Sequence, residues 1–212
     1  ANSNNWYSRA DATTGFIRAG WNGGSSQYLY TNGIYTDITN PSKMWGSLED
    51  YSDWSNFYKV VAQANMVIRK IDEIPDSKFK EGQKDRILGE AYFLRAFYHF
   101  HMVNIWGAIP YSTEPSKTQN FSPVRTPENV VYGGILGDLD RSIQLFAECN
   151  YKSKADGRAN YWAAKALRAR VLLYAASWLG GQLNEKVGGN ETYAAMDAKA
   201  LYKAAQDEAE AV

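Results

Sequence analysis

Two parts of this chain repeat one another, and the repeat limits the possible folds more than any other feature of the sequence. The tripeptide Leu-Arg-Ala occurs at residues 94–96 and again at 167–169, and at the same offset of 73 residues Gly107 matches Gly180. A helical pattern precedes each copy. The repeated unit is therefore a helix, a loop and a second helix, which predicts an all-α array of helical hairpins.

Apolar residues at steps of three and four predict the first two helices of this array. One runs from about Leu48 to Ile71. The second runs from about Gln83 to Trp106 and stops at Gly107, because glycine favours helix C-termini. Its predicted buried stripe comprises Ile87, Ala91, Leu94, Tyr98, His101 and Ile105.

Three further helices follow along the chain. The Thr-Pro-Glu motif at 126–128 predicts an N-cap, a proline at the first helical position and an acid in the first turn of the third helix. A fourth begins near Asn160 and ends before Gly180, and a fifth, from about Met196, continues to the last residue. We expect residues 47–212 to form a helical array truncated at its C-terminus, because the third unit stops within its first helix and leaves an apolar face uncovered.

Residues 1–46 do not follow a helical pattern. Asn-Gly, Gly-Gly and Asn-Pro pairs interrupt each apolar run before it reaches three turns. Aromatic residues are concentrated here, since 12 of the first 60 residues are Trp, Tyr or Phe. We expect a long irregular, aromatic-rich segment that belongs to the same domain as the array.

Charge and composition narrow the class of partner. The formal net charge is zero, with 23 basic and 23 acidic residues spread without blocks, so the chain has no long-range attraction for nucleic acid. It has no run of apolar residues long enough to span a bilayer. Its single cysteine, Cys149, has no histidine or second cysteine at metal-ligand spacing.

Four motifs in order carry a resemblance to a known family. The sequence GEAYFLRAFYHFHMVNIWGAIP at 89–110 resembles the signature helix of the SusD/RagB family of Bacteroidota, in which a Glu-Ala-x-Phe-Leu-Arg-Ala core leads into a Gly-x-x-Pro turn. The segments at 54–75, 121–143 and 157–178 resemble the family's flanking helices. The chain is therefore identified as a member of this family, with an incomplete sequence.

The resemblance implies both a fold and a function. It implies tetratricopeptide-like helical hairpins and non-catalytic binding of oligosaccharides at the outer face of the outer membrane, followed by delivery to a SusC-like TonB-dependent transporter. It also implies an N-terminal lipid anchor, absent from this sequence, and further ligand contacts from missing parts of the chain. The alternative is a RagB-like surface protein that binds peptides or a protein partner. No cofactor is expected, although a structural calcium ion stays open.

Aromatic side chains in the irregular segment are the predicted glycan-binding residues. Sugar rings have apolar faces bordered by hydroxyl groups, so proteins hold them with aromatic planes and a few polar side chains. A bulky aromatic residue in such a segment can instead anchor it to the core. The predicted site residues are Trp45, Trp21, Tyr35, Asp37, Tyr28 and Tyr30.

The sequence supports a catalytic function less well than glycan binding. His99 and His101 lie two apart on a helix, on different faces, and are interpreted as core or interface residues rather than metal ligands. Arg95 is predicted to make a structural contact with Tyr92 or with a carboxylate on a neighbouring helix. The carboxylates of Asp37, Glu49, Asp50 and Asp53 are available for glycoside hydrolysis, but nothing places two across a cleft. The glycine-rich residues 180–192 lack the ending of a phosphate loop and are predicted to form a surface loop.

Overall fold

The computed structural model describes residues 50–113, 124–152 and 157–212, without the side chains of residues 50–53. The chain divides into two compact units, Ala1–Phe57 and Tyr58–Val212, and the contacts below belong to the second. The predicted boundary between an irregular segment 1–46 and an array 47–212 remains a prediction, because residues 1–49 lie outside the described part.

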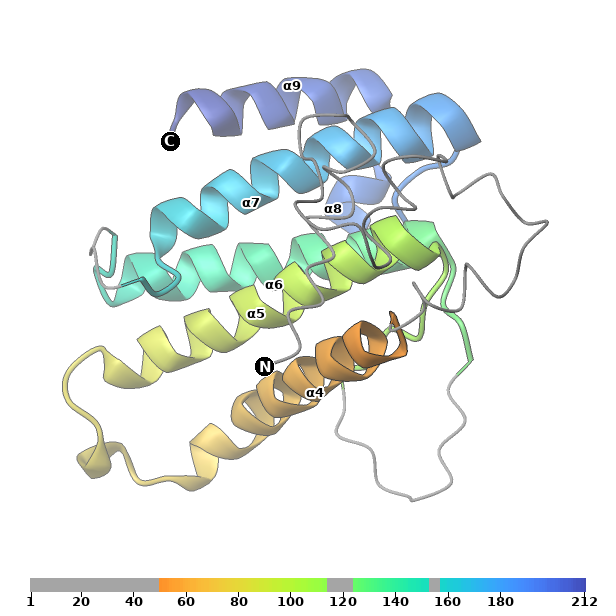
Figure 1. Ribbon diagram of the computed structural model, residues 1–212. Helices are drawn as coiled ribbons and strands as arrows, with labels where there is room; N and C mark the ends of the chain where they lie inside the picture. Colours follow the sequence, from red (N-terminus) through yellow and green to blue (C-terminus); the bar gives the residue numbers. More distant parts are fainter. Residues whose placement is uncertain (1–49, 114–123, 153–156) are drawn as a thin grey trace, which may run out of the picture. The chain divides into compact units, whose positions relative to one another are not determined.

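The described residues form a row of antiparallel helices (Figure 1). Neighbours along the chain lie side by side and alternate in direction: α6 packs between α5 and α7, and α9 packs on α7. No strand occurs in the described residues, which hold one isolated bridge between Ile109 and Thr126, so the all-α prediction is confirmed. The main helices are α4 (Asp50–Lys70), α5 (Gln83–Trp106), α6 (Glu128–Glu148), α7 (Tyr161–Tyr174), α8 (Glu191–Ala194) and α9 (Ala198–Glu210), with short 3-10 turns at Ile71–Glu73 and Asp76–Lys78.

Two helices begin at side-chain caps. The Asn160 side chain accepts a hydrogen bond from the Ala163 amide at 3.0 Å, and α7 begins at this position, near where the sequence predicts its start. Asp197 accepts one from the Ala200 amide at 2.8 Å at the start of α9. Each cap satisfies a backbone donor that the first helical turn leaves unpaired. The fifth helix ends at Glu210 rather than at the last residue.

The predicted N-cap of α6 is wrong. Pro127 occupies the cap position and no side chain caps the helix. Thr126 instead joins the two ends of the segment between α5 and α6: its amide donates to the Ile109 carbonyl at 2.8 Å, and its hydroxyl accepts from the Tyr111 amide at 3.3 Å. The hydroxyl is engaged by the loop, so it is not available to the helix.

The buried face of α5 also differs from the predicted stripe. Leu94 and Ile105 are 40% and 48% exposed, whereas the neighbouring face is buried. Apolar side chains surround this helix almost completely, so their spacing alone does not select a face. The face that packs against the other helices carries Gly89, Glu90, Ala91, Arg95, Ala96, His99, Phe100, Met102 and Val103.

The fourth helix does not stop before Gly180. Directly after α7 the chain continues as a π-helix over Ala175–Leu183, and Gly180 lies against α9, where a Cβ atom would be 2.6 Å from that of Ala198. The chain then returns along α6, with Val187 buried and the Gly188 amide donating to the Asn129 carbonyl at 3.0 Å. Residues 180–192 are therefore only partly the surface loop that the sequence predicts.

Candidate functional site

The six residues predicted to bind a glycan all lie within residues 1–49, outside the described residues. Trp45, Trp21, Tyr35, Asp37, Tyr28 and Tyr30 therefore remain predictions, and the structure does not place them relative to one another. The carboxylates considered for hydrolysis lie outside the described side chains too. Two sites can be built from the part that is described.

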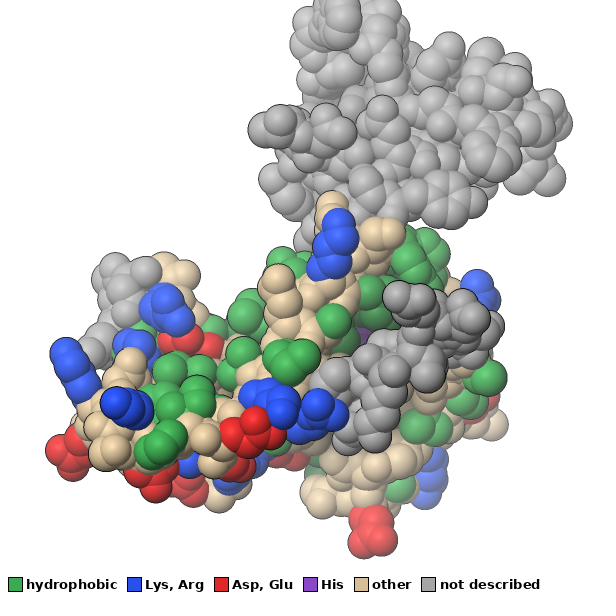
Figure 2. Space-filling view, turned by 90° about the horizontal axis from the view of Figure 1, so that it is seen from below, with side chains coloured by type: hydrophobic (Ala, Val, Ile, Leu, Met, Phe, Trp, Pro, Cys, Tyr) green, Lys and Arg blue, Asp and Glu red, His purple; other side chains and the backbone are tan. Residues whose placement is uncertain are grey.

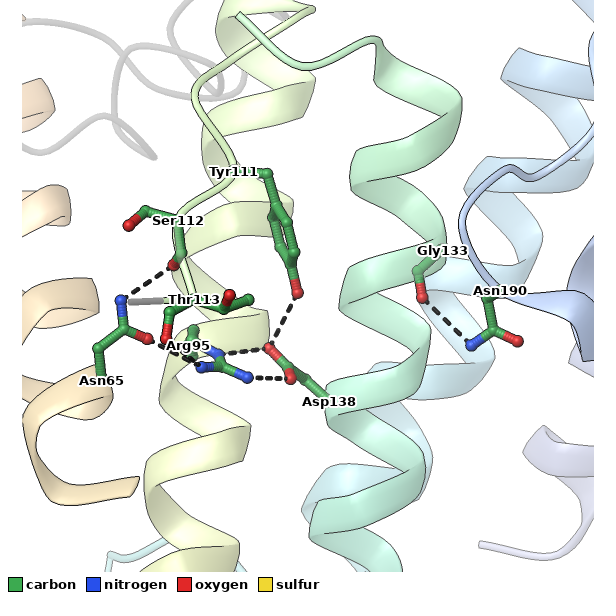
Figure 3. Close-up of polar contacts among 8 residues, drawn as sticks. All are labelled: Asn65, Arg95, Tyr111, Ser112, Thr113, Gly133, Asp138 and Asn190. Carbon is green, nitrogen blue, oxygen red and sulfur yellow. Dashed lines mark hydrogen bonds and ion pairs between the residues drawn. The ribbon is translucent and has the colours of Figure 1, made fainter. Parts of the chain in front are cut away.

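The first is a buried polar cluster around Arg95 of α5 (Figure 3). Its guanidinium donates to both oxygens of Asp138 on α6, from Nε at 2.8 Å and from Nη2 at 2.6 Å. Nη1 donates to Asn65 Oδ1 on α4 at 2.8 Å. The Arg95 and Asp138 side chains are each 7% exposed. Together with the guanidinium lying 5.2 Å from the centre of the Tyr92 ring, these contacts confirm the structural role predicted for Arg95.

This cluster also holds the start of the loop after α5. Asn65 Nδ2 donates to the Ser112 carbonyl at 3.0 Å, and the Tyr111 hydroxyl lies 3.4 Å from Asp138 Oδ2. The Tyr111 ring covers Gly134 of α6, where a Cβ would come within 2.3 Å of it. Residues 110–113 are thus fixed by groups from three helices, which makes the cluster a packing device.

His99 lies beside this cluster and is fully buried. Its ring centre is 4.6 Å from that of Tyr111 and 6.5 Å from that of Tyr58, and neither ring nitrogen has a hydrogen-bond partner among the described residues. Burial, with the nearby Arg95 charge, lowers the pKa of His99 to about 3. It is a neutral core histidine, as predicted, and the described residues hold no group of three metal-ligating side chains around it.

The second site, which we call the Trp178 pocket, is a hollow of about 640 Å³. It is lined by residues from the C-terminal ends of α5 and α7, the N-terminal end of α6, the π-helix and α9. These helix ends lie at one end of the row (Figure 1). Three aromatic side chains line it while remaining half-exposed: Trp178 at 44%, Tyr174 at 46% and Tyr202 at 44%.

Polar groups are fixed in the wall of the Trp178 pocket. The Trp178 indole donates from Nε1 to Glu128 Oε2 at 2.7 Å. The other carboxylate oxygen of Glu128 lies over Gly107, 3.0 Å from where a Cβ would be, and Gly107 has a φ of 68° that other residues rarely adopt. Tyr132 donates from its hydroxyl to Asn104 Oδ1 at 2.8 Å, which orients the Asn104 amide.

The sequence did not point to this pocket. Trp178 stands inside an alanine-rich helical run, where spacing suggests packing rather than binding. The signal that could have found it is the tryptophan next to Gly180-Gly181 in a segment of helix. Its partner Glu128 is more than forty residues away and was predicted only as a first-turn acid.

Neither the distribution of surface charge nor the length of the helices indicates a ligand for these two sites. On the face shown in Figure 2, basic and acidic side chains are interspersed over the described residues, rather than gathered by sign. None of the described helices is long and apolar enough to cross a membrane.

The geometry defines an all-α protein of antiparallel hairpins whose buried ion pairs join helices and whose aromatic side chains line a pocket. A family model described as "Starch-binding associating with outer membrane" matches residues 16–173. The match covers more than half of the chain, so the chain belongs to the SusD-like family, and the resemblance seen in the sequence is confirmed.

Relatives with this name are considerably longer than the chain. A SusD-like protein from Bacteroides ovatus is 34% identical over 130 residues, which are 60% of this chain and 23% of the relative. SusD-like protein P25 from Formosa agariphila is 31% identical over 129 residues, 60% of this chain and 24% of that protein. The chain thus spans about a quarter of the length of the curated relatives that it matches.

Solved structures share the fold. A laminarin-binding SusD-like protein is 32% identical, with a TM-score of 0.52 over 58% of this chain and 26% of that chain. A structure containing a xylogluco-oligosaccharide gives a TM-score of 0.65 over 96% of this chain and 36% of that chain. Its 22% identity supports the fold alone.

Proposed function

We propose that this chain is part of a cell-surface protein that binds oligosaccharides, without cleaving them, and delivers them to a SusC-like TonB-dependent transporter in the outer membrane. The observation that carries the proposal is the family match over residues 16–173, whose description names starch binding and the outer membrane. The laminarin-binding relative supports the same class of ligand.

The described residues are compatible with binding rather than hydrolysis. Glycoside hydrolysis needs two carboxyl groups that face one another across the substrate. The buried Asp138 is bound on both oxygens by Arg95 of the neighbouring helix, and Glu90 is paired with Arg158 in the segment before α7, so both carboxylates are engaged in contacts within the protein. We place the main ligand contacts in the aromatic segment, on Trp45, Trp21, Tyr35, Asp37, Tyr28 and Tyr30, as the sequence predicts.

Calorimetry on the full-length protein with laminarihexaose, maltohexaose and a xylogluco-oligosaccharide tests this function. We expect one of them to bind, and Trp45→Ala or Trp21→Ala to weaken binding by about 1 to 3 kcal/mol, because a buried aromatic contact is lost. Chromatography of the incubated glycan should show no product. Detectable cleavage would replace the proposal with an enzyme, and binding of peptides with no glycan bound would favour the RagB-like alternative.

Delivery to a transporter is tested separately. Full-length protein isolated from outer membranes with a mild detergent should carry a TonB-dependent transporter in stoichiometric amount. Isolation of the protein alone, under conditions that keep other such complexes together, would contradict the transporter partnership and leave the glycan-binding proposal standing.

A further inference from the structure

We infer that the Trp178 pocket is a second carbohydrate-binding site, which takes one pyranose ring of an oligosaccharide on the helical array itself. This inference rests on the proposed function for its class of ligand. The two sites lie in different parts of the chain: every residue predicted from the sequence to bind a glycan lies within residues 1–49, whereas this pocket is built from α5, α6, α7, the π-helix and α9.

The aromatic groups of the pocket suit a sugar ring. A pyranose has apolar C–H faces that stack on aromatic planes, and half-exposed indole and phenol rings offer such planes without having to be uncovered. Trp178, Tyr174 and Tyr202 expose 44 to 46% of their surface around a single hollow. The volume of about 640 Å³ lies within the usual range of small-ligand sites.

Two of these three aromatic groups, Trp178 and Tyr174, are held in place by contacts with the rest of the array. The indole of Trp178 is tied to Glu128 at 2.7 Å, and the Tyr174 ring packs edge-on against the buried Phe100, with centres 5.2 Å apart. A platform fixed before binding loses little side-chain entropy when the ligand arrives. These contacts therefore favour a preformed ligand site over an apolar surface that another part of the protein covers.

Hydrogen-bonding groups surround the platform. The Glu128 carboxylate has acceptor capacity beyond the single bond from the indole. Asn104 accepts from Tyr132 on Oδ1, which leaves its Nδ2 amino group as the donor on the other side of the exposed amide. Ser177 adds a hydroxyl group to the lining. Acceptor, donor and hydroxyl around apolar faces match the hydroxyl border of a sugar.

The exposed Leu173 and Ile105 at the wall raise the other possibilities, a helix of the full-length protein or a peptide. A purely apolar cover would leave the Glu128 carboxylate facing apolar atoms, at the cost of desolvating a charged group. A sugar satisfies both halves of the lining. We therefore commit to the sugar and make the other occupants outcomes of the test.

The test uses full-length protein and calorimetry with laminarihexaose, maltohexaose and a xylogluco-oligosaccharide. We expect Trp178→Ala to lower the affinity for the glycan that binds by about tenfold or more. If the wild-type titration shows two binding events, one for each site, the variant should lose one of them. Trp178→Phe, which keeps a stacking face, should retain most of the affinity. Trp162→Ala is the matched control, since this half-buried tryptophan lies at the opposite end of α7 and should leave affinity unchanged.

The indole N–H resonance of Trp178, assigned by its loss in Trp178→Phe, gives an independent readout of occupancy. It should shift when the glycan is added. Glycan binding that is unaffected by Trp178→Ala, with an unshifted resonance, would overturn this inference and leave the proposed function intact. Protection of the Trp178 indole from acrylamide quenching without glycan, measured as the difference in fluorescence from Trp178→Phe, would show that another part of the protein, or a peptide, fills the pocket, and would also overturn it. Failure of every glycan to bind would overturn both.

Discussion

Arg95 and Arg168 stand at equivalent places in the two copies of the sequence repeat, and both reach a carboxylate on the following hairpin. Arg95 binds Asp138 on α6, and Arg168 donates to Glu208 on α9 at 2.8 Å and to Asp140 at 2.5 Å. The two copies of the repeat therefore share an arginine–carboxylate contact between hairpins as well as a pattern of helices. The Arg95–Asp138 pair is the more buried, because both its side chains are 7% exposed, against 20% for Arg168 and 12% for Glu208.

We expect Asp138→Asn to lower the free energy of unfolding by about 3 to 5 kcal/mol, because it leaves the buried Arg95 charge without its partner. Urea denaturation followed by circular dichroism measures this. The double variant Arg95→Met with Asp138→Leu should recover most of the loss, since no charge then stays buried. Arg168→Met should cost less, because Glu208 still lies 3.5 Å from Lys165. An equal loss for Asp138→Asn and the double variant would contradict this account.

His99 gives a prediction about pH. Burial and the Arg95 charge lower its pKa to about 3 in the folded protein, against about 6.5 in the unfolded chain. Between these values only the unfolded chain binds the proton, so the stabilisation is complete above pH 6.5 and is lost as the pH falls toward 3. We expect His99→Phe, which keeps a ring against Tyr111, to remove about 2 kcal/mol of the loss seen between pH 7.5 and 5. Parallel stability curves for the two proteins would show that His99 takes up the proton when folded.

For the helices, the sequence predicts where each one begins and ends better than it predicts which face is buried. The bounds of α5 are predicted correctly, because Gly107 ends the helix with a backbone conformation that favours glycine. Its buried face is not, because Leu94 and Ile105 are as apolar as the side chains that pack. The sequence predicts that Arg95 meets a carboxylate on a neighbouring helix, but it does not identify Asp138. The two residues are 43 positions apart, and no local pattern relates them. The Trp178 pocket requires five elements to meet, α5, α6, α7, the π-helix and α9, and no local sequence pattern predicts such a meeting.

Gly134 and Gly137 of α6 form a matched pair for testing close packing. A Cβ on Gly134 would come within 2.3 Å of the Tyr111 ring, whereas one on Gly137 would meet only the Asn190 amide at 3.3 Å. We expect Gly134→Ala to destabilise the protein by about 1 to 3 kcal/mol through overpacking. Gly137→Ala should be neutral or stabilise it by up to about 1 kcal/mol through helix propensity. Thermal unfolding of both variants measures the difference, and equal effects would show that Tyr111 does not restrict this face.

For the whole molecule, the balance of charge makes a prediction about binding. The chain has 23 basic and 23 acidic residues, and its ion pairs, such as Lys84 with Asp72 and Asp76, join charges locally. Binding of a neutral glycan therefore gains nothing from long-range electrostatic attraction. We expect the dissociation constant to change by less than about twofold between about 50 and 500 mM NaCl. A steep loss of affinity with salt in calorimetry would indicate an anionic ligand.

The π-helix at Ala175–Leu183 has a consequence for how this chain tolerates changes of length. A π-helix accommodates an extra residue within a helix, because its hydrogen bonds span one residue more than those of an α-helix. Removing one residue from this stretch would let it relax to an α-helix while the residues downstream keep nearly the same direction, whereas a deletion inside a regular α-helix turns everything downstream by about 100°. A one-residue deletion between Tyr174 and Trp178 should thus be better tolerated in folding than one inside α6. It would nonetheless bring Trp178 one residue closer to α7 and displace the indole from Glu128, so the hydrogen bond in the pocket would be lost while the array stays folded.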